Sequence, residues 1–143
     1  MIEQKLQDDI SLLLIRASLR AKHGLLDIAE KYGLNPLQSL SVCVMQPGQA
    51  VPMNSLSNPL SCDVSSVTGI VDRLVEKGYA TRQENPQDRR VKIVTLTDKG
   101  AQIREELLRA NVGMRMPGLG SLSDNEAKEL VRLIIKTTGI TLV

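Results

Sequence analysis

The sequence has 143 residues, of which 42% are hydrophobic and 24% are charged, and its formal net charge is +2. This length and composition fit one globular domain and exclude a disordered chain. Two tyrosines are the only aromatic residues, which argues against the base-stacking surfaces of single-strand and RNA-binding modules.

Cysteine, histidine and long apolar runs are too sparse for several other classes of protein. Cys43 and Cys62 stand far apart without a CxxC pair, and His23 is the one histidine, so the sequence indicates neither a disulfide framework nor a zinc site. No apolar run approaches the length of a membrane span, and the first residues lack the pattern of a signal peptide. We therefore expect a cytoplasmic protein with no metal, no cofactor and no membrane partner.

A long amphipathic helix is predicted for residues 3–31. Apolar residues recur there at three- and four-residue steps and form one stripe along the helix. A long helix at one end of a small domain often packs on a partner helix. The stripe contains Leu6, Ile10, Leu13, Leu14, Ala17, Ala21, Leu25 and Ile28.

Two more helices follow, separated by a short element at residues 53–60. Asn35 and Pro36 begin the first, because Asn caps a helix and Pro suits its first position. Its expected buried stripe is Leu37, Leu40 and Val44. Asp63 caps the second, which ends before Gly78. Its expected buried side contains Val64, Val67, Ile70, Val71, Leu74 and Val75.

The pattern then changes to strands. Residues 79–83 and 91–96 are β-prone and flank a polar, partly basic turn, which predicts a hairpin. Thr97 caps the helix that follows, and residues 113–120 are expected to form a loop. Ser123 then begins a last helix in a capping box with the glutamate three residues later.

The order of these elements predicts a mainly α fold with a small β-hairpin wing. Residues 34–97 form a winged helix-turn-helix, the predicted DNA-binding lobe. Helices at residues 1–33 and 98–143 are left over from that unit, and we expect them to build a dimerisation lobe. The whole chain, residues 1–143, is expected to be one domain.

The helix that begins after Asp63 has the residues of a recognition helix. Small polar residues in its first turns let the backbone approach the major groove closely. Ser65 and Ser66 supply hydroxyl groups for phosphates or base edges. Gly69 removes bulk, and Arg73 is long enough to reach a guanine or a phosphate. The alternative is that the serines only cap a helix, as they do in many proteins.

The predicted hairpin turn carries Arg89 and Arg90 beside this helix. A wing arginine is attracted by the negative potential of a narrow minor groove. Asp88 would repel phosphate, so we expect its carboxylate to hold an arginine side chain by a charge-assisted bond. The alternative is a solvated hairpin whose surface ion pairs contribute little.

Three segments together resemble the core signature of the multiple antibiotic resistance regulator (MarR) family. They are DRLVEKGY at residues 72–79 with Arg82, DRR at residues 88–90, and LTDKG at residues 96–100. The resemblance covers about residues 35–110 by motif and the whole chain by element order. It implies a winged-helix homodimer whose terminal helices make the dimer.

The resemblance also implies a role for individual residues. The serines of the recognition helix enter the major groove in that family, and an Asp-x-Arg of the wing serves the minor groove. Most members are repressors that are relieved by small anionic or aromatic ligands or by cysteine oxidation. Carried over by position, the implied DNA-binding residues are Ser65, Ser66, Thr68, Arg73, Asp88 and Arg90.

Two features of the sequence are expected to weaken DNA binding. Pro59 falls inside the short helix before the recognition helix and removes one backbone donor. Residues 32–62 contain no charged residue, so that short helix has no basic side chain for phosphate. Binding is therefore expected to depend on the recognition helix and the wing.

Three residues are candidates for sensing. Cys62 precedes the cap of the recognition helix, where a helix N-terminus lowers a thiol pKa and Asp63 opposes this effect. The favoured interpretation of Cys62 is a small apolar packing residue rather than a redox switch. Arg20 and His23 are candidates to bind an effector carboxylate in a cleft between the terminal helices and the winged helix. The alternative for His23 is a solvated residue on the polar side of its helix.

These observations predict a regulator of transcription that is not an enzyme. It is expected to bind double-stranded DNA as a homodimer on a pseudo-palindromic operator, most simply as a repressor relieved by a small ligand. The other interpretation is a winged-helix module that binds proteins without specific DNA binding, favoured by the modest net charge and by Pro59. Steep salt dependence of duplex binding separates the two. An enzyme is the weakest interpretation, because the sequence shows no phosphate loop, metal cluster or nucleophile–base pair.

Overall fold

The computed structural model describes residues 1–141, and at residues 111–115 and 117 it describes the backbone alone. Its elements in chain order are α1 (Gln4–Lys31), α2 (Pro36–Val44), β1 (Val51–Pro52), the 3-10 helix η1 (Met53–Leu56), α3 (Ser57–Leu60), α4 (Val64–Glu76), β2 (Ala80–Glu84), β3 (Lys92–Leu96), α5 (Asp98–Arg115), the 3-10 helix η2 (Pro117–Ser121) and α6 (Asp124–Thr138). The predicted class, a mainly helical winged helix-turn-helix, is confirmed.

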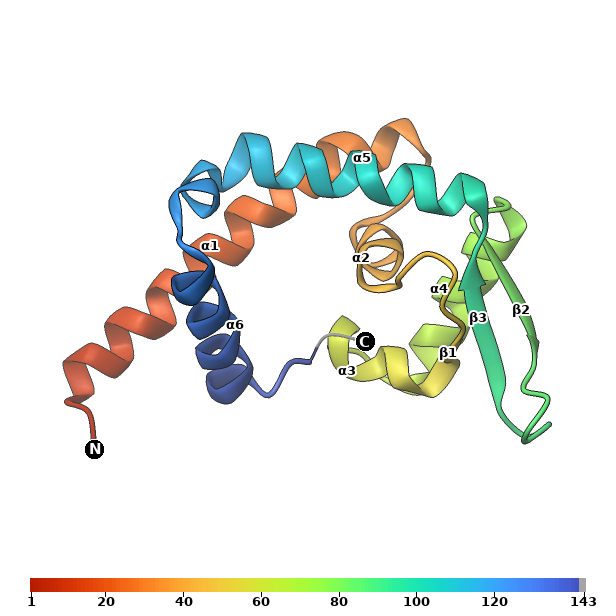
Figure 1. Cartoon of the computed structure of the whole chain (residues 1–143), viewed down its shortest axis with the longest axis horizontal. Coiled ribbons are helices and arrows are strands. Elements are labelled where there is room, and N and C mark those ends of the chain that lie inside the picture. Colours follow the sequence, from red (N-terminus) through yellow and green to blue (C-terminus); the bar gives the residue numbers. More distant parts are fainter. Residues whose placement is uncertain (142–143) are drawn as a thin grey trace.

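The long helix α1 lies against α5, and together they form one edge of the molecule (Figure 1). At its C-terminal end Ala29 is fully buried, and Lys31 and Tyr32 both bond the carboxylate of Glu106 on α5. Gly33, with φ +63°, then turns the chain into α2. The apolar residues of the N-terminal half of α1 are exposed in the single chain.

The first helix of the winged-helix lobe, α2, begins as predicted. Asn35 caps it in a reciprocal capping box with Gln38. The predicted buried stripe is wrong in part: Leu40 and Val44 are partly buried against the core, but Leu37 is exposed, and Ser39 and Val42 are fully buried. Since α1, α4 and α5 all pack on α2, nearly its whole circumference is enclosed, and amphipathic spacing does not identify its inner side.

The helix-turn-helix consists of α3 and α4. Pro59 is buried within α3, which ends at Leu60, and Ser61 makes the turn with a left-handed backbone, φ 50°. Asp63 caps α4 as predicted. The buried side of α4 is Val67, Ile70, Val71 and Leu74. Val64 and Val75 were expected there and are instead exposed, because they lie at the margins of the stripe.

The predicted hairpin forms the wing. β2 pairs antiparallel with β3, with Ala80 opposite Leu96 and Glu84 opposite Lys92. A third strand, β1, pairs with the other edge of β3 and gives the order β1-β3-β2. No sequence pattern predicted β1, because two residues ending in a proline have no recognisable strand period.

One core joins α2, α4, the sheet and the start of α5. Its fully buried side chains include Met45, Leu56, Leu74 and Val94. Gly100 on α5 approaches the chain so closely that a Cβ there would overlap the carbonyl oxygen of Tyr79. This contact holds the first turn of α5 against the beginning of the wing.

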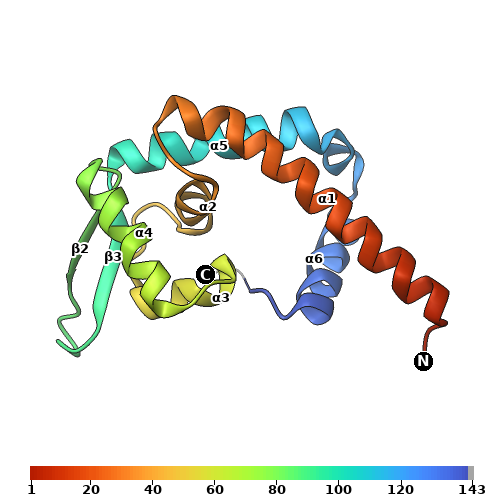
Figure 2. The ribbon, with the colours of Figure 1, turned by 180° about the vertical axis from the view of Figure 1, so that it is seen from behind.

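The last part of the chain leaves this core. α5 continues to Arg115 and η2 follows, so the loop expected at residues 113–120 is wrong in extent. Ser123 and Glu126 form the predicted capping box of α6. Figures 1 and 2 show α6 beside α1, at the end of the molecule away from the wing, with the chain after it returning to α3. No residue of α6 is buried.

Candidate nucleic-acid interface

The N-terminus of α4 is organised by the carboxylate of Asp63. This group accepts a hydrogen bond from the backbone N–H of Ser66 at 2.7 Å and another from the hydroxyl of Ser65 at 2.6 Å. Hydrogen bonds from Ser65 and then Ser66 lower the pKa of Asp63 to about 2. The carboxylate is therefore charged at neutral pH, and the proton of the Ser65 hydroxyl is already donated within the protein.

The outer face of α4 carries the predicted recognition residues. Ser65, Ser66, Thr68 and Gly69 are all exposed, and no atom lies within 4 Å of the position that a Cβ on Gly69 would take. Helical spacing places positions 65, 69 and 73 in one row. The guanidinium of Arg73, about half exposed, is 2.5 Å from the carboxylate of Glu76.

The wing tip places Arg89 and Arg90 in solvent. Within the described residues, neither guanidinium forms an ion pair or a hydrogen bond. The carboxylate of Asp88 accepts from the backbone N–H of Arg90 at 3.0 Å. The expected bond from Asp88 to an arginine side chain is therefore wrong, because the short carboxylate satisfies the turn backbone two residues ahead.

The other basic residues of the hairpin are paired. Lys92 lies 2.9 Å from Glu84 across the two strands, and Arg82 bonds Asp72 on α4. The second pair ties the wing to the recognition helix, and sequence reasoning missed it although both residues belong to the quoted motif. The basic charge that is free for phosphate therefore lies mainly at the tip of the wing.

A groove of about 530 Å³ runs between α4 and the wing. Thr68 lines it from the helix, and Gln83 and Lys92 line it from the strands. Figures 1 and 2 both show β2 and β3 extending beyond α4 at the same end of the molecule. The structure thus brings the α4 residues and the basic turn onto one end, as a helix and wing must lie to contact adjacent grooves of a duplex.

The candidate sensor residues lie elsewhere. Arg20 lines a cleft of about 650 Å³ between α1, η2 and α6, together with Arg16 and Leu130. His23 does not line that cleft. The cleft lies among the terminal helices rather than between them and the winged helix. Arg16 was missed as a candidate, although its spacing of four residues from Arg20 places both on one side of α1.

Both cysteines have raised thiol pKa values. Burial raises the pKa of Cys43 to about 11. Burial and the neighbouring Asp63 raise the pKa of Cys62. These directions favour the packing interpretation, because the thiolate is the reactive form.

Membrane-spanning helices and metal-binding clusters are both absent from the described part of the chain. None of its helices combines the length and the apolar character needed to cross a membrane. Among the same residues, no three histidine, cysteine or acidic side chains gather in an arrangement that could hold a metal ion.

Comparisons with known proteins agree with this geometry. The model of the MarR family matches residues 48–92. The HTH-type transcriptional repressor MdtR of Bacillus subtilis is 26% identical over 132 residues, which cover 92% of this chain and 85% of that protein. The HTH-type transcriptional regulator MgrA of Staphylococcus aureus is 29% identical over 109 residues, or 76% of this chain and 73% of that protein.

A solved structure of the E. coli MarR protein has the same architecture. It is a mutant form complexed with operator DNA, 26% identical to this chain, with a TM-score of 0.65. The match covers 91% of this chain and 94% of that chain. In its sequence motifs, its winged-helix fold and these relatives, the chain is similar to the MarR family of transcriptional regulators.

Proposed function

We propose that this protein is a homodimeric repressor that binds a pseudo-palindromic operator. The observation that carries the proposal is the exposed, small and polar face of α4 beside a wing tip with two unpaired arginines. The related E. coli protein forms a complex with operator DNA, and MdtR is named a repressor. With two copies related by a two-fold axis, half-sites about one helical turn apart, roughly 10 bp, are expected.

The residues of α4 divide into two roles. Ser66 and Thr68 are exposed and can meet base edges or phosphates, although the Thr68 hydroxyl must first leave the carbonyl oxygen of Val64, 3.4 Å away. Gly69 lets the helix backbone approach these groups. Ser65 is tied to Asp63 at 2.6 Å, so it contributes as an acceptor unless the cap rearranges. Arg73 reaches a phosphate only by releasing Glu76, which is a small cost for an exposed pair.

The wing supplies the second contact. Arg89 and Arg90 reach the minor groove or its flanking phosphates. The negative potential there attracts a guanidinium that has no carboxylate partner in the protein. Asp88 shapes the turn that presents them. Phosphate binding is expected to be concentrated here, because residues 32–62, which include α3, contain no charged side chain.

The terminal helices, residues 1–33 and 98–143, are proposed to form the dimer. A single chain leaves large apolar side chains exposed on α1 and α6, and exposed apolar surface of this kind marks a site of association. A second copy is the natural cover in a family of regulators that read symmetric sites. The exposed residues are Leu6, Ile10, Leu12, Leu13, Ile15 and Leu19 on α1 with Leu130, Val131, Leu133 and Ile134 on α6.

A small effector with a carboxylate and an apolar body is proposed to relieve repression. The cleft between α1, η2 and α6 offers Arg16 and Arg20 above apolar side chains, the pattern that binds such a ligand. Arg20→Ala should abolish release from the operator by an aromatic carboxylate while His23→Ala, which lies outside the cleft, leaves it intact. Equal release from both variants and the unchanged protein would contradict this site.

The DNA-binding proposal is tested by a salt series on a bound duplex. Arg90→Ala should weaken binding to all sequences and reduce the slope of log K against log salt by about one, because one phosphate contact is lost. Arg109→Ala is the matched control, because it removes an exposed arginine on α5, far from the wing. Equal affinity and slope for Arg90→Ala and the unchanged protein would contradict the wing assignment.

The base-reading role of α4 needs a different readout. Ser66→Ala should change which half-site sequences are preferred, whereas Arg90→Ala should not. Selection of bound duplexes from a library gives both preferences directly. A Ser66→Ala protein with an unchanged preference would mean that Ser66 contacts the backbone only.

One observation favours a second function, a winged-helix module for protein binding. The exposed surface of η1 and α3 is polar but uncharged, which suits a protein partner better than phosphate. Duplex binding that is weak and independent of salt would favour this function over the first.

A further inference from the structure

Among the described residues, the segment after α6 is hydrogen-bonded to the helix-turn-helix through the side chain of Asn58 on α3. Its Nδ2 donates to the carbonyl oxygen of Gly139 at 3.2 Å. Its Oδ1 accepts from the backbone N–H of Thr141 at 2.9 Å and from the Thr141 hydroxyl at 2.8 Å. The carboxamide of Asn58 therefore uses both its donor and its acceptor on the segment Gly139–Thr141; these three bonds are called the tail contact below.

Local geometry directs the chain end toward α3. Gly139 ends α6 with φ +70°, and its N–H donates to the carbonyl of Ile135 at 2.9 Å. The N–H of Ile140 then donates to the hydroxyl of Thr138 at 3.2 Å. The left-handed backbone of Gly139 turns the chain away from the helix axis, and Figures 1 and 2 show the chain crossing from α6 to α3.

The tail contact lies beside the start of the recognition helix. A shallow groove of about 560 Å³ is lined on one side by Thr138 and Ile140. On the other side it is lined by Ser61, which makes the turn, and by Asp63, which caps α4. The contact thus joins α6 to the segment from which α4 begins.

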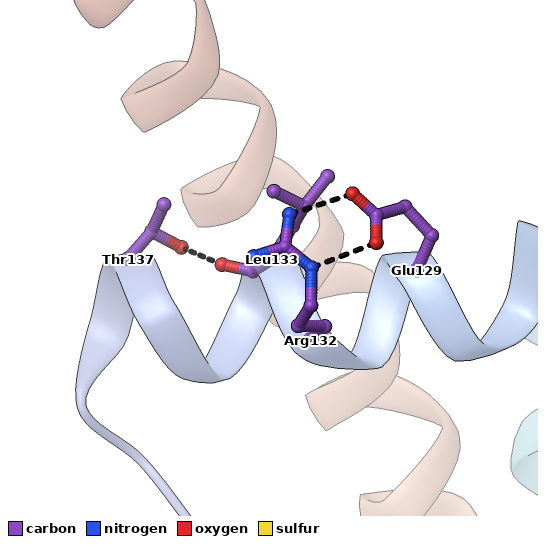
Figure 3. A network of polar contacts seen from close by, with 4 residues as sticks. All are labelled: Glu129, Arg132, Leu133 and Thr137. Carbon is purple, nitrogen blue, oxygen red and sulfur yellow. Dashed lines mark hydrogen bonds and ion pairs between the residues drawn. The ribbon is translucent and has the colours of Figure 1, made fainter.

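Apart from the tail contact, α6 packs only loosely on the rest of the described chain. None of its residues is buried. Its ion pair, Arg132 with Glu129, has both N–O distances at 2.7 Å and lies entirely within the helix (Figure 3). Thr137 likewise bonds the carbonyl of Leu133 on the same helix. The position of α6 relative to α4 therefore depends on η2 at one end and on the tail contact at the other.

We propose that the tail contact is a positioning device for DNA binding. By tying α6, part of the proposed dimerisation lobe, to the turn before α4, it sets the separation of the two recognition helices in the homodimer. Asn58 is then a positioning residue that determines which half-site spacing is accepted, without itself reading bases. This inference rests on the proposed function, and it adds a specificity determinant outside the recognition helix and the wing.

The first experiment measures affinity for duplexes whose two half-sites are moved together or apart by one and two base pairs. Asn58→Ala and a chain ending at Thr138 are compared with Asn54→Ala, which changes an exposed asparagine four residues earlier. The unchanged protein and Asn54→Ala should prefer one spacing. Loss of three exposed hydrogen bonds should reduce that preference about tenfold in both tail variants. Both tail variants should keep the half-site sequence preference of the unchanged protein and should remain dimers.

Two further comparisons separate positioning from simple destabilisation. Asn58→Ala in the shortened chain should have no additional effect, because both changes remove the same interaction. Spin labels on Glu76 of α4 and Lys128 of α6, with the native cysteines replaced by serine, should give a narrow distance distribution in the intact chain. That distribution should become broader in both tail variants.

The outcomes are distinguishable. An unchanged spacing profile or an unchanged label distribution in the tail variants overturns the inference. If no duplex is bound by any of the proteins, the proposed function fails, and the label distances alone still decide whether the tail contact positions α4. A broadened distribution with a flattened spacing profile supports the inference.

Discussion

At the scale of single residues, the carboxylate of Asp63 has two opposing effects. It satisfies the first turn of α4 through Ser65 and Ser66, and it places a negative charge where a DNA phosphate would approach. Its lowered pKa, about 2, shows that the charged form is the better cap. We therefore expect this carboxylate to order the first turn of α4 while lowering the affinity of the protein for DNA.

Asp63→Asn separates these effects, because Asn also caps helices well. At neutral pH the variant should bind DNA more tightly. The charged cap stabilises the fold above pH 4 and is lost as pH falls from about 4 to 2. The Tm of the variant relative to the unchanged protein should therefore rise as the pH is lowered from 7 to 3. A Tm difference independent of pH would show that the cap is not charge-dependent.

At the scale of elements, residues that act on their immediate neighbours were predictable. Asn35, Asp63, Thr97 and Ser123 each cap the helix that the sequence assigns to them. The β2–β3 hairpin was also predictable, because its strand residues and its polar turn adjoin one another in the chain.

Structural features that depend on contacts between distant segments of the chain could not be predicted from the sequence. The exposure of Leu37 and the pairing of β1 with β3 are set by elements far away in the sequence. At the site, exposure of the α4 serines and the wing arginines followed from the local pattern. The Arg82–Asp72 pair and the tail contact required the folded chain.

Gly69 on α4 and Gly100 on α5 give a matched test of how these two helices are packed. Gly69→Ala should stabilise the fold by about 0.5–1 kcal/mol, because alanine favours a helix and the added Cβ meets open space. The same change should weaken DNA binding by filling the face that approaches the groove. Gly100→Ala should destabilise the fold by about 1–3 kcal/mol or more, since its Cβ would overlap the backbone at Tyr79.

Chemical denaturation and duplex titration of both variants measure these effects. The two glycine changes are expected to shift the free energy of unfolding in opposite directions. Tight operator binding by Gly69→Ala would place the α4 backbone away from the groove.

In the whole molecule, α1 and α6 leave apolar residues exposed, and the tail contact ties the end of α6 to α3 of the proposed DNA-binding lobe. A partner that covers those apolar residues would also orient α4. Dimerisation and DNA binding are therefore expected to fail together when this surface is altered.

Val131→Asp on α6 tests that link. Its side chain is about half exposed in the single chain, so the fold of one copy should survive, whereas a buried, unpaired carboxylate should prevent association. Light scattering should give the mass of one chain, and operator affinity should fall to the level of non-specific binding. A variant that remains dimeric would exclude this part of α6 from the interface.

Two copies of the chain are expected to present their recognition helices to one duplex. Selection of bound sequences from a random duplex library, repeated at two salt concentrations, tests it most directly. We expect a two-fold symmetric motif with half-sites about one helical turn apart and binding that weakens steeply with salt. Recovery of no motif, with weak binding that disappears at modest salt, would contradict it.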